Sequence, residues 1–457
     1  MEKIKSITLE NFKFFYGLKN NGDKTHNTID LNRKNLMVYG ENGSGKSSIY
    51  WALYTFLQSV YKTEAEVKKY FDPTNNQNLV NRFAKNGERS SVEITFEDEN
   101  QATSTRHISV TSNTKPGTLV REAAVSSDFI NYKYLSRMHD FRNSEYIDLF
   151  PLFEKDILMF VKFTSEFEAG NSNALDWYKN IKFGMNPRPN MHEQPYKDFI
   201  LKIDRFNEEL EKYIYKLVES ANGYLQDKFK QPYRIFLNYY NGSYDDFLPE
   251  STTRRNHKFT RPKIRLTIEY IHGNLDEDKS ILEKPHTFLN ESRLTIIALS
   301  LRFAILEEKL ISAAPKILVL DDFLISLDMN KRDLILDVIL DEFKDDFQLI
   351  ILSHDKLFLE YLKHKIVKQN KFENWTYLEM YEDSLDSIPI PFITHANSYF
   401  EKAQKYLKQH EYEISGNFLR KAAEEFCKSF LPKHLQITQD CSFLTLEGLI
   451  SQSIKYA

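Results

Sequence analysis

The sequence has little cysteine and no long apolar run. Its 457 residues include two cysteines, Cys427 and Cys441, which are too few for a disulfide framework or a four-cysteine zinc site. Runs of 18 apolar residues are absent, so neither a transmembrane helix nor a membrane partner is expected. The first residues lack the apolar core of a signal peptide. Together these absences predict a protein of the reducing cytoplasm.

A strong excess of either charge is also missing. The 61 basic and 65 acidic residues give a formal net charge of -4. A protein whose whole surface attracts nucleic acid is therefore not expected, and any such contact must come from a local patch or from a partner. The 41% hydrophobic and 28% charged residues are ordinary for a globular protein. The length suits roughly two to four domains, or one large domain with insertions.

What the sequence does contain is a complete phosphate-loop motif. "GENGSGKS" at 40–47 follows an apolar strand pattern and precedes a helical pattern that runs to about Tyr61. In such a motif the glycines let backbone N–H groups surround phosphates, the lysine contacts the β- and γ-phosphates, and the serine hydroxyl binds magnesium. The motif predicts ATP and Mg²⁺ as ligands, with Ser47 on the metal and nucleotide contacts from Gly40, Asn42, Gly43, Ser44, Gly45, Lys46, Ser47 and Ser48.

Two further motifs lie far along the chain. Four apolar residues at 317–320 predict a buried parallel strand that ends at Asp321 and Asp322. We expect Asp321 to hold magnesium through water and Asp322 to polarise the attacking water. "LIILSHD" predicts another apolar strand, followed by His354 within reach of a γ-phosphate. The simpler alternatives are that the two acids cap a loop and that the histidine is structural.

The layout between these motifs indicates an insertion, because the phosphate loop and residues near 320 must meet in space. Period-two alternation over 90–128 predicts an antiparallel sheet. Residues 129–235 are mostly helical in pattern, and 196–229 has the best-formed apolar spacing. A proline-bearing break is expected at 387–392, with helices from about 397 onward. Other expected strands are 4–10, 28–39, 233–240 and 263–271, and a further helix is expected from about Ser292.

These motifs together resemble the ABC-type ATPase heads of the SMC/RecF/RecN group. The resemblance is strong over 1–60, with its opening "IKSITLENFKFFYG", and over 285–365, with "LDDFLISLD" and "LIILSHD". It implies an α/β fold: an ABC-type P-loop ATPase head with an antiparallel β lobe, an inserted short helical arm and a C-terminal helical segment. The expected parts are the head at 1–160 and 236–385, the arm at 161–235 and a helical module at 386–457. We expect that module to continue beyond the last residue.

The signature motif of this family departs from its usual form here. In the family, "LSGGE" of one subunit contacts the γ-phosphate held by the other, and Asn290, Glu291 and Ser292 stand in place of its Ser-Gly-Gly. Asn290 and Ser292 still offer hydrogen bonds to phosphate, whereas Glu291 adds negative charge and the lost glycines hinder close backbone approach. The resemblance also implies a nucleotide contact from Asp328 and a head-to-head dimer around ATP, or a higher oligomer of such dimers. The segment 128–141 should supply the family's glutamine-loop residue.

We expect slow hydrolysis, because Asp322 is one methylene shorter than the glutamate usual in the family. The leading hypothesis is a regulatory ATPase of bacterial anti-phage defence, similar to the Septu ATPase subunit, which controls a separate nuclease of the HNH type. The second is a RecF-like repair ATPase that binds DNA through Arg254, Arg255 and Lys258, for which a solvated hairpin is the alternative. The third is an RNase toxin acting through C-terminal helices of HEPN type. Those helices lack the R-x(4–6)-H motif of HEPN ribonucleases. Its absence favours a role in packing or partner docking over catalysis.

Overall fold

The computed structural model describes residues 2–17, 27–113, 118–163, 173–184, 192–247, 256–271, 280–308, 315–369, 371–395, 399–438 and 442–456. The chain divides into two compact units. The larger unit contains Met1–Thr376 and Met380–Phe392, and the smaller contains Tyr377–Glu379 and Ile393–Ala457. Among the helices of these described ranges, none is both long and apolar enough to cross a membrane.

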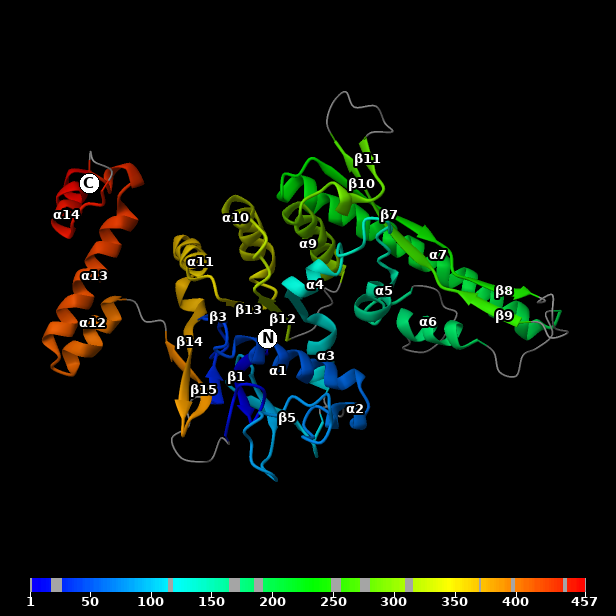
Figure 1. Cartoon of the computed structure of the whole chain (residues 1–457), viewed down its shortest axis with the longest axis horizontal. Helices are drawn as coiled ribbons and strands as arrows, with labels where there is room; N and C mark the ends of the chain where they lie inside the picture. The colour runs from blue at the N-terminus through cyan, green and yellow to red at the C-terminus, as the bar shows by residue number, and fades with distance from the viewer. Residues whose placement is uncertain are drawn as a thin grey trace. The chain divides into compact units, whose positions relative to one another are not determined.

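A six-stranded sheet brings together segments that are far apart in the sequence (Figure 1). Its four parallel strands are buried runs of mostly branched apolar residues, as parallel strands covered on both faces usually are. Because they are parallel, their carboxyl ends share one edge, where ligands of such sheets bind. In sheet order the strands are β15 (Ile388–His395), β14 (Trp375–Leu385), β3 (Asn35–Gly40), β13 (Gln348–Ser353), β12 (Ile317–Asp321) and β6 (Asp128–Asn131).

A second, antiparallel sheet forms a separate lobe, with the order β2 (Thr28–Asp30), β1 (Lys3–Glu10), β4 (Ser91–Glu97) and β5 (Thr103–Ser109). The side-chain amide of Gln348 joins this lobe to the parallel sheet. Its Oε1 accepts from Ile4 N at 2.7 Å, and its Nε2 donates to the carbonyl oxygens of Ile4 and Lys34 at 3.0 and 2.7 Å. The buried amide therefore fixes β1 beside β3 and β13.

The structure corrects two of the expected strands. Residues 28–39 form two strands rather than one, because Asn32 and Arg33 adopt positive φ of 52° and 64° and turn the chain from one sheet to the other. The antiparallel sheet expected over 90–128 ends at β5. Thr118–Ser126 is a helix, α3, whose buried Val120, Ala123 and Ala124 recur at helical spacing, and β6 pairs in parallel with β12.

Residues 375–395 also differ from expectation. The proline-bearing segment expected as a break is the strand β15, which forms a hairpin with β14. Asp386 and Ser387 link the two strands with φ of 51° and 66°, the conformation of a two-residue primed turn. The prolines at 389 and 391 are tolerated because β15 is at the sheet edge.

The helices of the head come from both halves of the chain. In α1 (Lys46–Gln58) the predicted face is fully buried at Ile49, Leu53 and Phe56. The other helices of the head are α2 (Glu64–Lys68), α4 (Tyr132–Ser136), α5 (Phe150–Leu152) with the π-turn Phe153–Ile157, α9 (Glu291–Glu308), α10 (Met329–Val338) and α11 (Lys356–Lys368).

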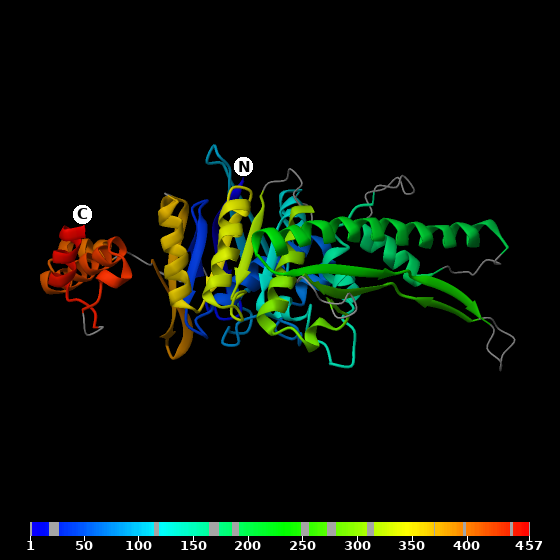
Figure 2. The same ribbon diagram turned by 90° about the horizontal axis from the view of Figure 1, so that it is seen from above.

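The inserted arm combines a long helix with strands, which run side by side in Figure 2. The helix expected over 196–229 is α7 (Gln194–Gly223), continued by the π-turn Tyr224–Lys228. Asn207 of α7 binds the strand turn: its Oδ1 accepts from Gly242 N and the Tyr239 hydroxyl, and its Nδ2 donates to Gly242 O. Of the other elements near α7, α6 (Ala174–Phe183) lies within the expected arm at 161–235. The strands extend past its expected end: β7 (Tyr233–Tyr240), β8 (Ser243–Phe247), β9 (Asn256–Thr260), β10 (Lys263–Tyr270) and β11 (Ile281–Leu282).

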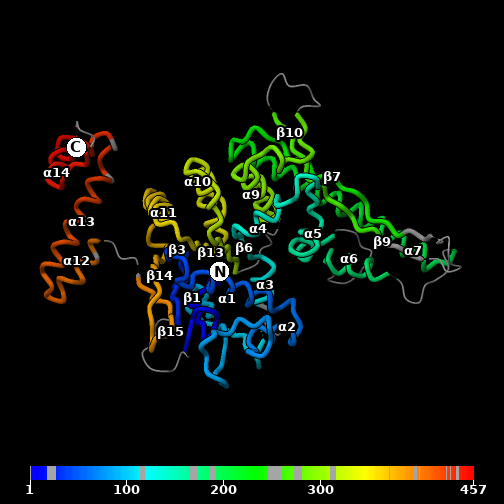
Figure 3. Tube along the Cα trace, viewed as in Figure 1, coloured from blue at the N-terminus to red at the C-terminus, as the bar shows by residue number. Residues whose placement is uncertain are grey.

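The smaller unit is helical, as predicted from about residue 397 onward (Figure 3). Its helices are α12 (Tyr399–Lys408), α13 (Tyr412–Phe430) and α14 (Leu446–Tyr456). Cys427, Leu431 and Leu449 form a small core. Many of its other apolar side chains remain exposed, among them Phe400, Leu407, Phe426, Phe443 and Ile454.

Candidate active site

The phosphate loop connects β3 to α1 and is shaped by its glycines. Gly43 and Gly45 have φ of 93° and 100°, a conformation that strains other residues. A Cβ on Gly40 would lie 2.4 Å from Ser44 Oγ and 3.0 Å from Met380 O. The loop therefore curls tightly at the N-terminus of α1, where backbone N–H groups favour an anion.

Lys46 is folded back over this loop. Its side chain is buried, and Nζ donates to the carbonyl oxygens of Gly40 at 2.5 Å and Glu41 at 3.0 Å. Burial lowers the pKa of Lys46, while the charges of Asp322 and Asp321 act in the opposite direction. These carbonyl contacts occupy the ammonium group that the motif assigns to the phosphates.

The loop's other polar side chains differ in their surroundings. Asn42 and Ser47 are exposed. Ser44 Oγ is buried and makes no hydrogen bond with any described residue. Ser48 Oγ accepts from Phe14 N at 3.3 Å, so Ser48 supports the loop from the β1 side.

Asp321 lies at the end of β12 with one carboxylate oxygen unsatisfied. Its Oδ1 is buried and finds no hydrogen-bond partner in the described part of the chain. Burial, followed by the neighbouring Asp322, raises the pKa of Asp321 to about 7, although Lys46 and His354 oppose the shift. Buried polar atoms are nearly always satisfied, and a carboxylate oxygen in this situation suits Mg²⁺ or a water molecule bound to it. The described residues contain no cluster of three His, Cys, Asp or Glu side chains able to hold a metal.

Asp322 and His354 form a pair between adjacent parallel strands. Asp322 N donates to Leu352 O at 3.0 Å, and its φ is 47°. Its Oδ1 accepts from His354 N at 3.0 Å and lies 2.9 Å from His354 Nδ1. The two residues expected to handle the attacking water and the γ-phosphate are therefore in direct contact.

The signature residues and Asp328 form a cluster of their own. Asn290 caps α9 by accepting from Arg293 N at 3.1 Å, and Asp328 caps α10 by accepting from Lys331 N at 3.1 Å. Lys331 Nζ lies 2.9 Å from Ser292 Oγ and 3.3 Å from Asp328 Oδ2. These partners belong to α9 and α10, not to the phosphate loop.

Glu291 is held by the segment that was expected to supply the glutamine loop. The Tyr132 hydroxyl donates to Glu291 Oε1, which raises the pKa of Tyr132. Both residues begin helices: Tyr132 is the first residue of α4 and Glu291 the first of α9. The acid that replaces a signature glycine therefore has a partner within its own chain.

Three supporting residues were missed by sequence reasoning: Tyr132, Lys331 and Arg332. Arg332 Nε donates to Leu324 O at 3.1 Å and Leu327 O at 2.8 Å, and its Nη1 donates to Asp355 at 2.6 Å. Arg332 thereby fixes the loop before Asp328 to the residue that follows His354. The sequence shows Lys331 and Arg332 as two adjacent basic residues shortly after "SLD". Their hydrogen-bond partners, however, are set by tertiary packing.

The proposed DNA patch lies largely beyond what the structure covers. Arg254 and Arg255 fall outside the described residues. The backbone of Lys258 pairs with Asp245 between β8 and β9.

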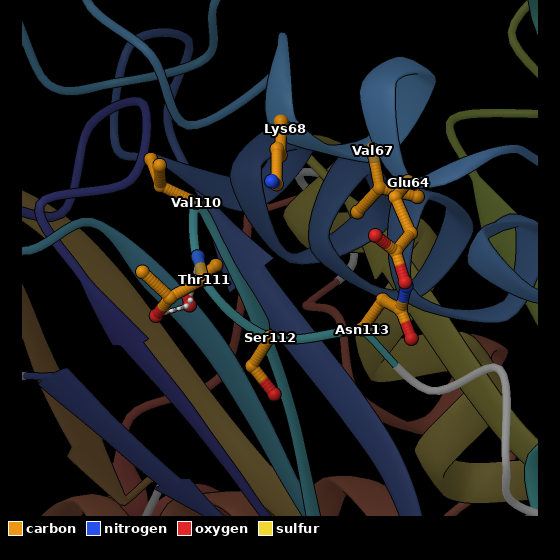
Figure 4. Close-up of a pocket in the computed structure, with 8 residues that line it drawn as sticks. Glu64, Val67, Lys68, Val110, Thr111, Ser112 and Asn113 are labelled. Carbon is orange, nitrogen blue, oxygen red and sulfur yellow. Dashed lines mark hydrogen bonds between the residues drawn. The ribbon is translucent and has the colours of Figure 1, made fainter.

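A cavity of about 280 Å³ between α2 and the end of β5 is lined by Lys68, Thr111 and Ser112, among others (Figure 4). It includes no residue of the phosphate loop.

The chain belongs to the RecF/RecN/SMC N-terminal domain family, whose model matches residues 3–375. It is therefore an ABC-type ATPase head of the SMC/RecF class, as its motifs indicated, and ATP hydrolysis is the activity of that class. No curated protein matches the chain.

Several solved structures are similar to the chain. An Smc head from Pyrococcus furiosus bound to the C-terminal domain of ScpA has 15% identity and a TM-score of 0.45, covering 90% of this chain and 100% of that one. A RecF–ATP structure has 14% identity and a TM-score of 0.40, covering 78% and 92%. An SMC head from Thermotoga maritima has 16% identity and a TM-score of 0.35, covering 86% and 99%.

Proposed function

We propose that this chain is a slowly hydrolysing ATPase subunit that dimerises head to head around ATP and thereby regulates a separate nuclease in anti-phage defence. The observation that carries the dimer is that the signature residues and the phosphate loop hydrogen-bond to different elements. The hydrogen bonds of Asn290, Ser292 and Asp328 run to α9 and α10, whereas Lys46 binds carbonyl groups of its own loop. A second copy would supply the signature residues to this phosphate loop.

The residues present fit ATP and magnesium. Lys46 and the loop N–H groups would hold the β- and γ-phosphates, while Ser47 and the unsatisfied oxygen of Asp321 would hold Mg²⁺. Bound Mg²⁺ neutralises the charge that develops on the phosphate oxygens. Asp322 would orient the attacking water and accept its proton.

Slow ATP hydrolysis is expected from the hydrogen bonds of Asp322 and from the negative charge of Glu291. Oδ1 of Asp322 is already occupied by two nitrogen atoms of His354. Fewer lone pairs of a short carboxylate then remain for water, which weakens general-base catalysis. Glu291 adds a negative charge beside Ser292, which disfavours approach of the partner's γ-phosphate.

The proposed partner would dock on the smaller unit. Phe426, Phe443 and Ile454 are 69%, 74% and 73% exposed there. Exposed groups of large apolar side chains often mark protein interaction sites. The assignment of that partner as an HNH-type nuclease rests on the resemblance to defence ATPases, which is an analogy between families.

The test combines copurification with nucleotide assays. The protein is isolated with its genomic neighbours expressed, and nuclease activity is measured with and without ATP. We expect a separate nuclease to copurify and its activity to depend on ATP. If none copurifies and the protein alone cleaves DNA, the regulatory role is wrong.

The nucleotide site itself is tested by Lys46→Ala, with Lys34→Ala as the matched exposed control. Loss of a charge-assisted phosphate contact should weaken ATP binding by roughly 30-fold or more. Unchanged ATP affinity in Lys46→Ala would refute the phosphate-loop assignment whatever the partner proves to be.

A further inference from the structure

A second cavity, of about 450 Å³, lies between α1, β6, α4 and the π-turn Phe153–Ile157. Its volume falls in the range of roughly 300–1,000 Å³ that is typical of small-molecule sites. Its lining on α1 begins at Tyr50. Residues 40–47 are not among the residues that line it, so this cavity is distinct from the ATP site.

One wall of the cavity is aromatic. The rings of Tyr50 and Tyr54 are parallel within 6° at 6.2 Å, and Phe129 meets both edge to face at 5.5 and 5.4 Å. Trp51 packs edge to face on Tyr54 and is 40% exposed. A partly exposed indole beside a rigid stack of rings is a platform on which a nucleobase can stack.

The floor of the cavity is polar and buried. The side chains of Arg302 and Asp128 form an ion pair and are 5% and 3% exposed, and Arg302 Nη1 donates to the Tyr134 hydroxyl at 2.6 Å. Arg302 Nε and Asp156 Oδ2 are buried, and neither hydrogen-bonds to any residue that the structure describes. The two atoms offer a donor and an acceptor to a ligand with both functions on one edge, as a nucleobase has.

The charge around this floor favours an anion. Five basic side chains and two acidic side chains line the cavity, and three of the basic ones, Lys133, Arg137 and Lys155, are exposed. Exposed lysine and arginine next to a stacking surface suit a phosphate attached to the stacked base.

We propose that this cavity is a second nucleotide-binding site that takes a nucleoside monophosphate. The base stacks on Trp51 and therefore meets Tyr54 edge to face, because the two ring planes are 83° apart. Its polar edge meets Asp156 and Arg302, and its phosphate lies among Lys133, Arg137 and Lys155. This site does not depend on the proposed dimer or on nuclease control, because all its residues belong to one chain.

The indole provides a direct readout. The full chain is titrated with adenosine and guanosine monophosphate while tryptophan fluorescence is followed. Stacking on Trp51 should quench part of the emission from the chain's three tryptophans, and the quenching should saturate. Trp51→Phe should remove the quenching while calorimetry still detects binding.

Two sets of variants separate this site from the phosphate loop. The charge reversal Lys155→Glu, outside the segment 128–141, should weaken monophosphate binding at least tenfold and leave ATP binding unchanged. Lys46→Ala should do the reverse. Lys85→Glu, at an exposed lysine, serves as the charge-matched control and should change neither.

Three results would overturn the proposal. One is the absence of saturable quenching by either monophosphate. Another is quenching that Lys46→Ala abolishes, since the ligand would then occupy the phosphate loop. The third is quenching by single-stranded oligonucleotides but not by monophosphates, which would identify a nucleic-acid surface instead.

Discussion

Asp322 Oδ1 accepts a hydrogen bond from the backbone N–H of His354 at 3.0 Å and lies 2.9 Å from Nδ1 of the same residue. The contact arises because β12 and β13 are parallel neighbours, so the residues that follow them meet at one edge of the sheet. The residues proposed to activate water and to contact the γ-phosphate are therefore held together.

Asp322→Asn should stop hydrolysis without preventing ATP binding. The amide is a poor base, and loss of general-base catalysis typically costs roughly 100- to 10,000-fold in rate. Steady-state phosphate release and equilibrium ATP binding measure the two effects. Asp346→Asn, a change at an exposed aspartate, is the control and should behave as wild type. A hydrolysis rate within threefold of wild type for Asp322→Asn would rule out Asp322 as the base.

Gly45→Ala, in the phosphate loop, should weaken ATP binding, whereas Gly87→Ala, outside that loop, should not. Both glycines have positive φ, 100° and 86°, but a Cβ on Gly45 would lie 2.9 Å from Phe14 Cδ1, whereas Gly87 has open space around it. Alanine at either site costs about 1 kcal/mol of backbone strain, and only Gly45→Ala adds a clash beside the phosphates. ATP affinity should fall in Gly45→Ala alone, while thermal unfolding compares the stability of the two variants. Equal ATP affinities of the two variants would contradict the close packing around Gly45 in the phosphate loop.

Arg332→Lys should uncouple the loop before Asp328 from the segment that follows His354. Lysine keeps the charge but lacks the planar group with which Arg332 binds Leu324 O, Leu327 O and Asp355 together. We expect ATP binding by the isolated chain to persist while hydrolysis falls by about tenfold or more. Rapid kinetics that separate binding from phosphate release test this expectation. Normal hydrolysis in Arg332→Lys would show that the loop is held by other contacts.

The pH dependence of stability should report the raised pKa of Asp321. Because burial raises its pKa to about 7, the folded carboxyl keeps its proton while the unfolded one ionises from about pH 4 upward. Stability is therefore lost as pH rises from about 4 to 7. Asp321→Asn removes this loss, so without nucleotide or metal it should be more stable than wild type at pH 8, by at most about 4 kcal/mol.

The difference in unfolding free energy between Asp321→Asn and wild type should shrink to zero as the pH falls toward 4. Chemical denaturation at several pH values measures it, and Asp346→Asn should follow the wild-type curve. A gap that instead widens at acidic pH would mean that the pKa of Asp321 is lowered by folding.

Local patterns predicted the central part of this protein correctly. The buried strand at 317–320, the helix after the phosphate loop and the long helix of the arm all have strong short-range periodicity, which the structure preserves. The membership in the SMC/RecF class follows from the same motifs, because a phosphate loop and the acids after an apolar strand carry their chemistry in a few adjacent residues.

Other elements depended on what they pack against. Residues 118–126 have apolar side chains compatible with a strand or a helix, and packing against α1 decides for the helix. The prolines at 389 and 391 suggested a break, yet an edge position lets β15 keep them. Neither outcome is encoded within a short window of sequence.

The sequence by itself determined the class of protein, because the phosphate-loop motif and the acids after the apolar strand are contiguous motifs. Only the tertiary structure decided the couplings between them: His354 on Asp322, Lys331 on Ser292 and Arg332 on Asp355. It also decided where Arg302, Asp156 and Trp51 gather around one cavity. Such contacts join residues far apart along the chain, and their geometry is set by strand order and helix packing rather than by any local pattern.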